Sequence, residues 1–127
     1  MARRLLLAAF LMAGICGFAQ QTGTETVMTT YRAKAGKEDE VLKALDQARV
    51  LMLSHKMVLP EPHLVLRGQD ENQKTYFVEI LTWVDHDAPD HAPAELTAVW
   101  NQLEAMCEKR DGHRGIEFPE VRVVRTK

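Results

Sequence analysis

One glutamate stands inside the most strongly apolar segment of the chain outside its first residues. Glu79 lies between Phe77 and Leu81 in residues 74–84, which are rich in the residue types that favour β-strands. Side chains alternate across a strand, so Glu79 shares its face with these two apolar side chains. Burial raises the pKa of a carboxyl group and allows it to act as a general acid or base. Glu79 is therefore the first candidate for a catalytic residue.

The preceding strand carries side chains that could meet Glu79. An ion pair with Arg67 of that strand, or with Arg122, is the simpler role for Glu79, because buried carboxylates are usually paired. His63 and Arg67 alternate with Val65, so they point to the same side and are candidates for lining a ligand cavity. Solvation of His63 at the start of the strand is the alternative.

A cluster of polar side chains follows residues 74–84. Residues 83–91 hold three aspartates together with His86 and His91. Imidazole and carboxylate groups suit Zn²⁺, but the spacing of five between the two histidines matches no helical motif such as H-E-x-x-H. A turn segment is the better interpretation, and a metal-binding protein that uses this loop is the less favoured alternative. We predict that Trp83 and His86 line the ligand cavity, with His91 as a second catalytic candidate beside Trp83.

Hydrophobic periodicity predicts six elements that would position these residues. In chain order they are a strand at 25–32, a helix at 37–53, strands at 63–68 and 74–84, a helix at 93–107 and a strand at 116–124. Pro119 within the last segment favours an edge position or a bulge. The order predicts a ferredoxin-like α+β plait, in which an antiparallel four-stranded sheet carries two helices on one face.

Apolar residues recur at steps of three and four in both predicted helices. In the first helix these residues include Val41, Leu45, Ala48 and Met52. Trp100 and Cys107 lie on the stripe of the second helix, which favours core packing over ligand stacking for the tryptophan. Packing is also the expected role of the thiol, since free cysteines are often buried.

Residues 74–84 are apolar on both faces of the predicted strand, although two helices cover only one face of the sheet. We assign Phe77, Leu81 and Trp83 to the face away from the helices. Monomers seldom expose such a patch, and a twofold copy of the same face is the commonest cover. The sequence therefore predicts a homodimer. A C-terminal tail folded over the sheet, or helices that are longer or shifted, is the alternative.

The first nineteen residues have the pattern of a secretory signal peptide. Two arginines precede a short apolar run, and residues 17–19 place small side chains at the positions that a signal peptidase recognises. We expect a leader at 1–19, a flexible arm at 20–24, one domain at 25–127, and a periplasmic or secreted protein with no membrane association after leader removal. Lipidation of Cys16 is the alternative, although Ile15 stands where a small residue is preferred.

The charge of the chain argues against nucleic-acid binding. The full sequence has a formal net charge of −2, and removal of the leader takes two arginines with it. Nucleic-acid binding needs clustered Lys and Arg to displace counterions. We therefore expect no nucleic-acid partner.

The chain resembles the antibiotic-biosynthesis-monooxygenase (ABM) domains of the dimeric α+β barrel superfamily. The resemblance rests on Tyr31 and the turn at 35–38 that leads into the first helix, and on the strand at 76–83 followed by a histidine-containing loop and a helix. It implies a homodimer that binds a small apolar or aromatic molecule. If the protein is an enzyme, the resemblance implies either cofactor-independent oxygenation or an isomerisation that uses Glu79 or a histidine as base. No cofactor is implied. A non-catalytic ligand-binding or interaction module is the alternative.

The haem-degrading branch of the same fold is not supported by these residues. That branch uses an asparagine on the first strand, together with a tryptophan and a histidine elsewhere. Residues 26–31 contain no asparagine, and Trp83 matches a strand-end aromatic residue of the group instead of the catalytic tryptophan. Haem degradation is therefore not carried over to this chain.

Overall fold

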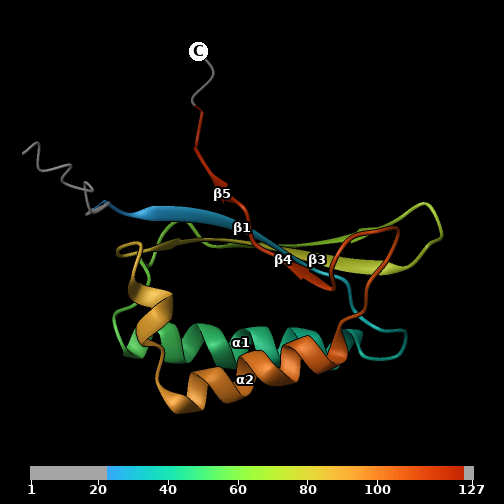
Figure 1. The fold of residues 1–127 in the computed structure, drawn as a ribbon, viewed down its shortest axis with the longest axis horizontal. Coiled ribbons are helices and arrows are strands. Elements are labelled where there is room, and N and C mark those ends of the chain that lie inside the picture. Colours follow the sequence, from blue (N-terminus) through green and yellow to red (C-terminus); the bar gives the residue numbers. More distant parts are fainter. Residues whose placement is uncertain (1–22, 125–127) are drawn as a thin grey trace, which may run out of the picture.

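Two helices lie side by side against one face of an antiparallel sheet (Figure 1). The computed structural model describes residues 23–124. The elements are β1 (Glu25–Tyr31), α1 (Glu38–Ser54), β2 (Leu64–Gln69), β3 (Thr75–Trp83), the 3₁₀ helix η1 (Ala88–His91), α2 (Ala94–Met106), β4 (Ile116–Glu117) and β5 (Glu120–Val121). Each predicted helix and strand is present, with ends shifted by a few residues. The leader predicted at 1–19 lies outside the described residues, as does most of the arm.

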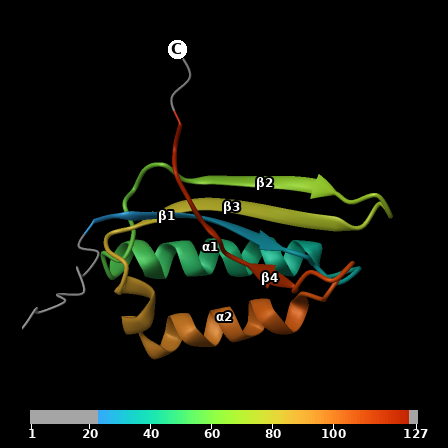
Figure 2. The same cartoon turned by 45° about the horizontal axis from the view of Figure 1, so that its top comes forward.

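The strands have the order β2-β3-β1-β4 (Figure 2), and β5 also pairs with β1. All pairings are antiparallel. This topology confirms the predicted ferredoxin-like plait. Glu79 of β3 lies opposite Thr29 of β1 and Val65 of β2, so the candidate carboxylate occupies the centre of the sheet.

The last predicted strand is divided in two. β4 and β5 are separated by Phe118 and Pro119, and both pair with β1 at the edge of the sheet. Proline has no N–H to donate, but the backbone N–H of Met28 donates to the Pro119 carbonyl at 3.1 Å. The edge position predicted from Pro119 is therefore observed.

The hydrophobic core fills the space between the sheet and the helices. The predicted stripe of α1 (Val41, Leu45, Ala48, Met52) is buried, as are Leu96 and Leu103 of α2. Cys107 is buried in one cluster with Val41, Leu45 and Leu103, which confirms its packing role. Burial raises the pKa of the Cys107 thiol to about 11.

The assignment of the two faces of β3 was wrong. Phe77, Leu81 and Trp83 point toward the helices and belong to the core, and Glu79 lies on the same side. Both faces of this strand are apolar, so alternation shows which residues share a face but not which face the helices cover. The larger aromatic side chains fill the volume between the two layers.

The face of the sheet away from the helices is also apolar, but it is formed by other residues than those predicted. β2 exposes Leu64 and Leu66, which lie opposite Ile80 and Val78 of β3 in the sheet register. Met28 of β1 lies opposite Ile80 from the other side and is also exposed. We call this set, Met28, Leu64, Leu66, Tyr76, Val78 and Ile80, the outer face. An apolar surface therefore remains uncovered in a single copy, although its residues are not the predicted ones.

A buried arginine, Arg110, forms hydrogen bonds that connect several segments at the end of the molecule opposite η1. The Arg110 guanidinium donates to the Thr75 carbonyl at 2.8 Å and to the Ala33 carbonyl, and its Nε donates to Glu108 at 3.1 Å. Asp70 of the β2–β3 hairpin lies 3.5 Å from the same guanidinium. One side chain thus joins the segment after α2 to the sheet.

Replacement of this arginine by methionine tests how much that connection stabilises the fold. Arg110→Met keeps much of the apolar stem but leaves two buried carbonyls without a donor. We expect the free energy of unfolding to fall by about 2–3 kcal/mol, measured by urea denaturation. Arg122→Met, at an exposed arginine, is the matched control and should change it by less than about 0.5 kcal/mol. Equal unfolding midpoints for the two variants would contradict this role.

Among residues 23–124, no helix is both long enough and apolar enough to span a bilayer.

Candidate functional site

The carboxylate of Glu79 is almost completely withdrawn from solvent, with 2% of the residue exposed. Its Oε2 lies 3.0 Å from Nε2 of His63, and its Oε1 accepts a hydrogen bond of 3.4 Å from the Tyr31 hydroxyl. His63 precedes β2 and its side chain remains 25% exposed. A chain of polar groups therefore runs from solvent through His63 to Glu79 and on to Tyr31.

Tyr31 is held as a neutral hydroxyl at ordinary pH. Burial, followed by the nearby charge of Glu79, raises the pKa of Tyr31 well above its ordinary value of 10.0. A neutral phenol donates a hydrogen bond to the carboxylate and still offers its oxygen as an acceptor. The site can therefore accept a proton at Glu79 and hold a polar atom near Tyr31.

These groups border a cavity of about 340 Å³ between the sheet and the helices. Its walls include Glu79, Tyr31, Thr29 and Trp83 from the sheet, and Met52, Trp100 and Leu103 from the helices. Trp83 and Trp100 meet edge to face, with ring centroids 6.3 Å apart. The cavity is mostly apolar with a few polar groups, as is usual for small-molecule sites. We call it the central cavity.

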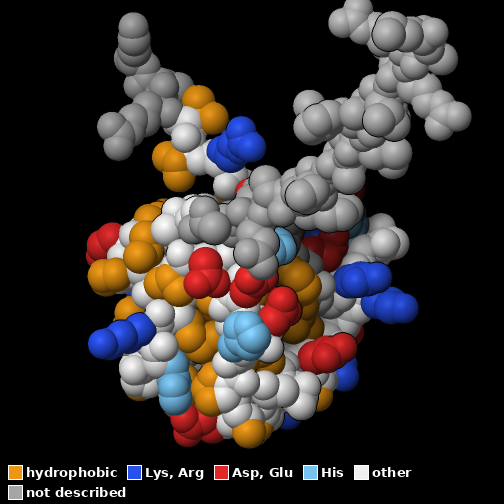
Figure 3. Space-filling view, turned by 60° about the vertical axis from the view of Figure 1, so that its left-hand side comes forward, with side chains coloured by type: hydrophobic (Ala, Val, Ile, Leu, Met, Phe, Trp, Pro, Cys, Tyr) orange, Lys and Arg blue, Asp and Glu red, His pale blue; other side chains and the backbone are white. Residues whose placement is uncertain are grey.

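The end of the central cavity near η1 is lined by charged and polar groups. Glu25, His86 and Asp90 lie there, and Nδ1 of His86 is paired with the Glu25 carboxylate. Figure 3 shows acidic and histidine side chains among hydrophobic surface at this end of the molecule. The hydrogen bond and the charge of Glu25 raise the pKa of His86 above its ordinary value of 6.5.

This pairing predicts a measurable titration. The Glu25 carboxylate favours the charged imidazolium, so an NMR titration should place the pKa of His86 above 6.5, and Glu25→Gln should lower it. Because the pKa of His86 is higher in the folded state, the pair stabilises the fold at pH values below the unfolded-state pKa of His86. This stabilisation is lost as the pH rises through the folded-state pKa of His86. An unchanged His86 titration in Glu25→Gln would contradict the pairing.

The predicted site residues fall into two groups. Trp83 and His86 line the central cavity with Glu79, and His63 contacts Glu79 from outside the cavity wall. Arg67 and His91 do not join them.

Arg67 does not pair with Glu79, and that prediction was wrong. Arg67 lies opposite Phe77 in the sheet register, and its guanidinium sits over the Phe77 ring at 5.8 Å. Val65 occupies the position opposite Glu79. His63 and Tyr31 contact the carboxylate, whereas no salt bridge links Arg122 to it in the described part of the chain.

His91 lies on a different surface from the central cavity. It lines an open hollow together with His55, Lys56 and Pro93, whereas His86 faces the central cavity. Within residues 23–124, no group of three or more His, Cys, Asp or Glu side chains has an arrangement that could hold a metal ion. The two histidines of residues 83–91 are therefore not brought together as ligands.

Tyr31 is the main site residue that the sequence analysis missed. Val27, Thr29 and Tyr31 alternate along β1 and share the helix-facing side with Glu79. Their alternation was visible in the sequence, but the pairing of β1 with β3 was needed to bring Tyr31 to Glu79. Trp100 combines two roles, since it packs against both core clusters and lines the cavity.

Comparison with known proteins supports the fold. No protein-family model and no curated protein sequence matches this chain. Among solved structures, SnoaB, a cofactor-independent oxygenase from Streptomyces nogalater, is similar with a TM-score of 0.60 and 19% identity, covering 82% of this chain and 96% of SnoaB. An antibiotic biosynthesis monooxygenase is similar with a TM-score of 0.58 and 17% identity, covering 80% of this chain and 99% of that protein.

A third structure shares the same architecture. A dimeric ferredoxin-like protein of unknown function from Jannaschia sp. has a TM-score of 0.57 and 16% identity, covering 80% of this chain and all (100%) of that protein. At these identities the likeness concerns the fold. The chain therefore has the ferredoxin-like fold that these solved structures share, as the sequence analysis predicted.

Proposed function

We propose that this chain is an exported homodimeric protein whose central cavity binds a small apolar or aromatic molecule and supports cofactor-independent monooxygenation. The observation that carries the proposal is a buried carboxylate, Glu79, at the wall of a mostly apolar cavity. The similarity in fold to SnoaB, described as a cofactor-independent oxygenase, is consistent with it. Export rests on the sequence pattern of residues 1–19 alone.

The uncovered outer face supports the homodimer. Leu64 and Leu66 are 52% and 51% exposed, and they continue across the register into Val78 and Ile80. Burial of large aliphatic side chains contributes roughly 1.5–3 kcal/mol each when complete. A second copy placed on the same face by a twofold axis would cover both apolar surfaces at once.

The chemistry begins with proton transfer to Glu79. A CH₂ group acidified by adjacent aromatic rings would lose a proton to the carboxylate, and the carbanion would add to O₂ as a peroxide anion. The proton returns to give a hydroperoxide, and loss of water leaves a ketone. The carbon loses two hydrogens and gains one oxygen, the second oxygen leaves as water, and the substrate supplies all four electrons that O₂ accepts.

The surroundings of Glu79 suit this proton transfer. The mostly apolar walls limit the water around the carbanion, and the neutral Tyr31 hydroxyl, which donates its one proton to Glu79, holds the carboxylate in place. His63 connects the carboxylate to solvent and can return or remove a proton between turnovers. The base, the hydroxyl that positions it and the exit for the proton all belong to this chain.

Substitution of the carboxylate tests the proposal. We expect Glu79→Gln to lower oxygen consumption with anthrone, whose CH₂ lies between two aromatic rings, by about 100-fold or more, because an amide cannot accept the proton. Binding of the neutral probe 2-naphthalenemethanol, followed by tryptophan fluorescence, should change little. Glu71→Gln, at an exposed glutamate of the hairpin loop, is the matched control. Binding that persists with no oxygen consumption by the wild type would overturn the catalytic part.

A non-catalytic ligand-binding module is the second candidate. It is favoured by one observation: both oxygens of Glu79 already have partners, His63 and Tyr31, so the carboxylate has a structural role without any substrate. The same two measurements separate the candidates, since this module would bind the neutral probe and consume no oxygen.

A further inference from the structure

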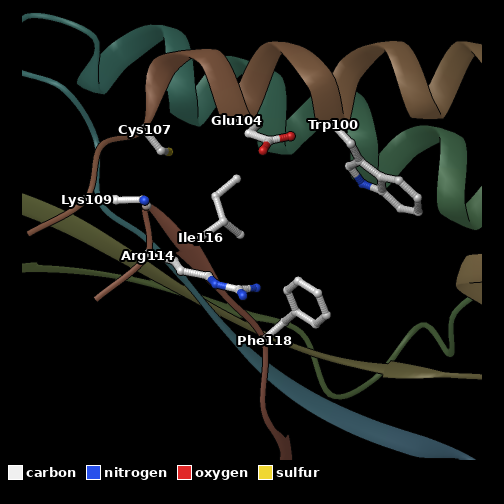
Figure 4. A pocket seen from close by; sticks show the side chains of 8 residues that line it. Trp100, Glu104, Cys107, Lys109, Arg114, Ile116 and Phe118 are labelled. Carbon is white, nitrogen blue, oxygen red and sulfur yellow. The ribbon is translucent and has the colours of Figure 1, made fainter. Parts of the chain in front are cut away.

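A second hollow adjoins the central cavity between α2 and β4. Its volume is about 580 Å³, and Trp100, Ile116 and Phe118 line both spaces. Figure 4 shows α2 on one side and the segment that carries Ile116 and Phe118 on the other. We call this hollow the side groove. A molecule in the central cavity that extends past Phe118 would enter the side groove.

The side groove contains two cationic side chains. Lys109 and Arg114, two exposed residues of the segment between α2 and β4, line the side groove, and the Arg114 guanidinium points toward Phe118 (Figure 4). Among the described residues, neither side chain has a carboxylate within 4.0 Å, although Arg32 and Arg110 nearby are both paired. Two cations without a partner therefore face a space that is otherwise lined largely by apolar atoms.

The backbone beneath these cations is fixed in position. Arg32 donates from its guanidinium to the Arg114 carbonyl at 2.7 Å, and its backbone N–H donates to the Gly115 carbonyl at 2.8 Å. A Cβ at Gly115 would lie 2.9 Å from the Glu108 nitrogen, so the two ends of this segment pack tightly together. Such support reduces the entropy lost when an anion is bound.

One acidic side chain, Glu104 of α2, opposes the cations across the side groove. The Cys107 thiol adds no negative charge near neutral pH, because burial raises its pKa to about 11. The lining therefore carries two positive charges against one negative charge, which favours a single anionic group placed on the side of Lys109 and Arg114.

We propose that the side groove binds the carboxylate of an aromatic acid, whose ring system passes between Trp100 and Phe118 into the central cavity. The exposed Phe118 ring, 68% accessible, provides an apolar surface at the junction of the two spaces. This inference rests on the proposed function in one respect, since it places the body of the ligand in the same central cavity. It adds the substrate class: an aromatic ring system with an acidic group at one end.

The test compares the binding of two probes of nearly the same shape to the purified protein. 2-Naphthoate carries a carboxylate, and 2-naphthalenemethanol carries a neutral CH₂OH in its place. Dissociation constants are measured by quenching of Trp83 and Trp100, which are the two tryptophans of the sequence. We expect the wild type to prefer 2-naphthoate by roughly tenfold or more, as charge-assisted hydrogen bonds imply.

Variants that change the charge of the side groove should change the dissociation constant of 2-naphthoate only. Removal of positive and of negative charge should change it in opposite directions. Lys109→Gln combined with Arg114→Gln should weaken 2-naphthoate binding by roughly tenfold, and Glu104→Gln should strengthen it by a few fold. Lys43→Gln, at an exposed lysine of α1, is the control for a lost positive charge and should leave both constants unchanged. An opposite shift in Glu104→Gln cannot arise from partial unfolding.

The outcomes separate this inference from the proposed function. Binding of the neutral probe without preference for 2-naphthoate, or equal weakening of both probes in the double variant, overturns the carboxylate site and leaves the central cavity intact. Binding of 2-naphthoate alone, lost in the double variant, supports the carboxylate site and counts against an apolar ligand in the central cavity.

Discussion

Leu64→Glu combined with Leu66→Glu is expected to convert the proposed dimer into folded monomers. Both leucines are about half exposed on the outer face, so their replacement removes little from the core of one copy. In a twofold dimer the two substitutions would remove four buried leucines and bury four carboxylates. The dissociation constant should rise by about a thousandfold or more, measured by sedimentation velocity over a range of concentrations.

The matched control introduces the same charge on the helical side of the molecule. Val50→Glu combined with Leu53→Glu replaces two exposed apolar residues of α1, and the dimer should persist in this variant. Far-UV circular dichroism should show native secondary structure for both double variants. A wild-type protein that sediments as a single copy at every concentration would refute the homodimer.

Phe77→Ala should lower the free energy of unfolding by about 3–5 kcal/mol. Phe77 is 1% exposed and packs between the sheet and the helices with Val41, Leu45 and Leu103. Removal of its ring leaves a cavity that these neighbours cannot fill without moving. The measurement is denaturant unfolding at a protein concentration where association does not change, so that the core is tested separately from the interface.

Phe118→Ala provides the same chemical change at an exposed position. Its ring is 68% accessible, so the free energy of unfolding should change by less than about 1 kcal/mol. Had Phe77 faced away from the helices, as the sequence analysis expected, Phe77→Ala would have weakened association and left a single copy nearly as stable. Similar unfolding midpoints for these two variants would restore that assignment.

The sequence predicted which strand and which type of residue form the candidate site, but it did not predict which groups contact that residue. Alternation along β3 identified Glu79 as a carboxylate among apolar side chains, and the structure places it among them. Which cation or donor meets it depends on register: Val65 takes the position opposite Glu79, and Arg67 is displaced to Phe77. Register is set by the joint packing of several strands, so one strand's sequence does not reveal it.

The side groove shows the same limit more strongly. Lys109 and Arg114 stand in an unremarkable polar segment between α2 and β4, and no spacing singles them out. They lie beside Trp100 and Phe118 because β4 returns to the edge of the sheet beneath α2. Long-range chain reversal of this kind creates a site from residues that have no local pattern.

The sequence by itself determined the six predicted elements, their order and the apolar stripes of α1 and α2, because periodicity is a local property of the chain. It also determined that both faces of β3 are apolar. The tertiary structure decided which face the helices cover, which groups contact Glu79, and where the two hollows meet. These depend on the relative volumes and the register of elements far apart in the chain, and only packing of the whole domain selects among the arrangements that local pattern allows.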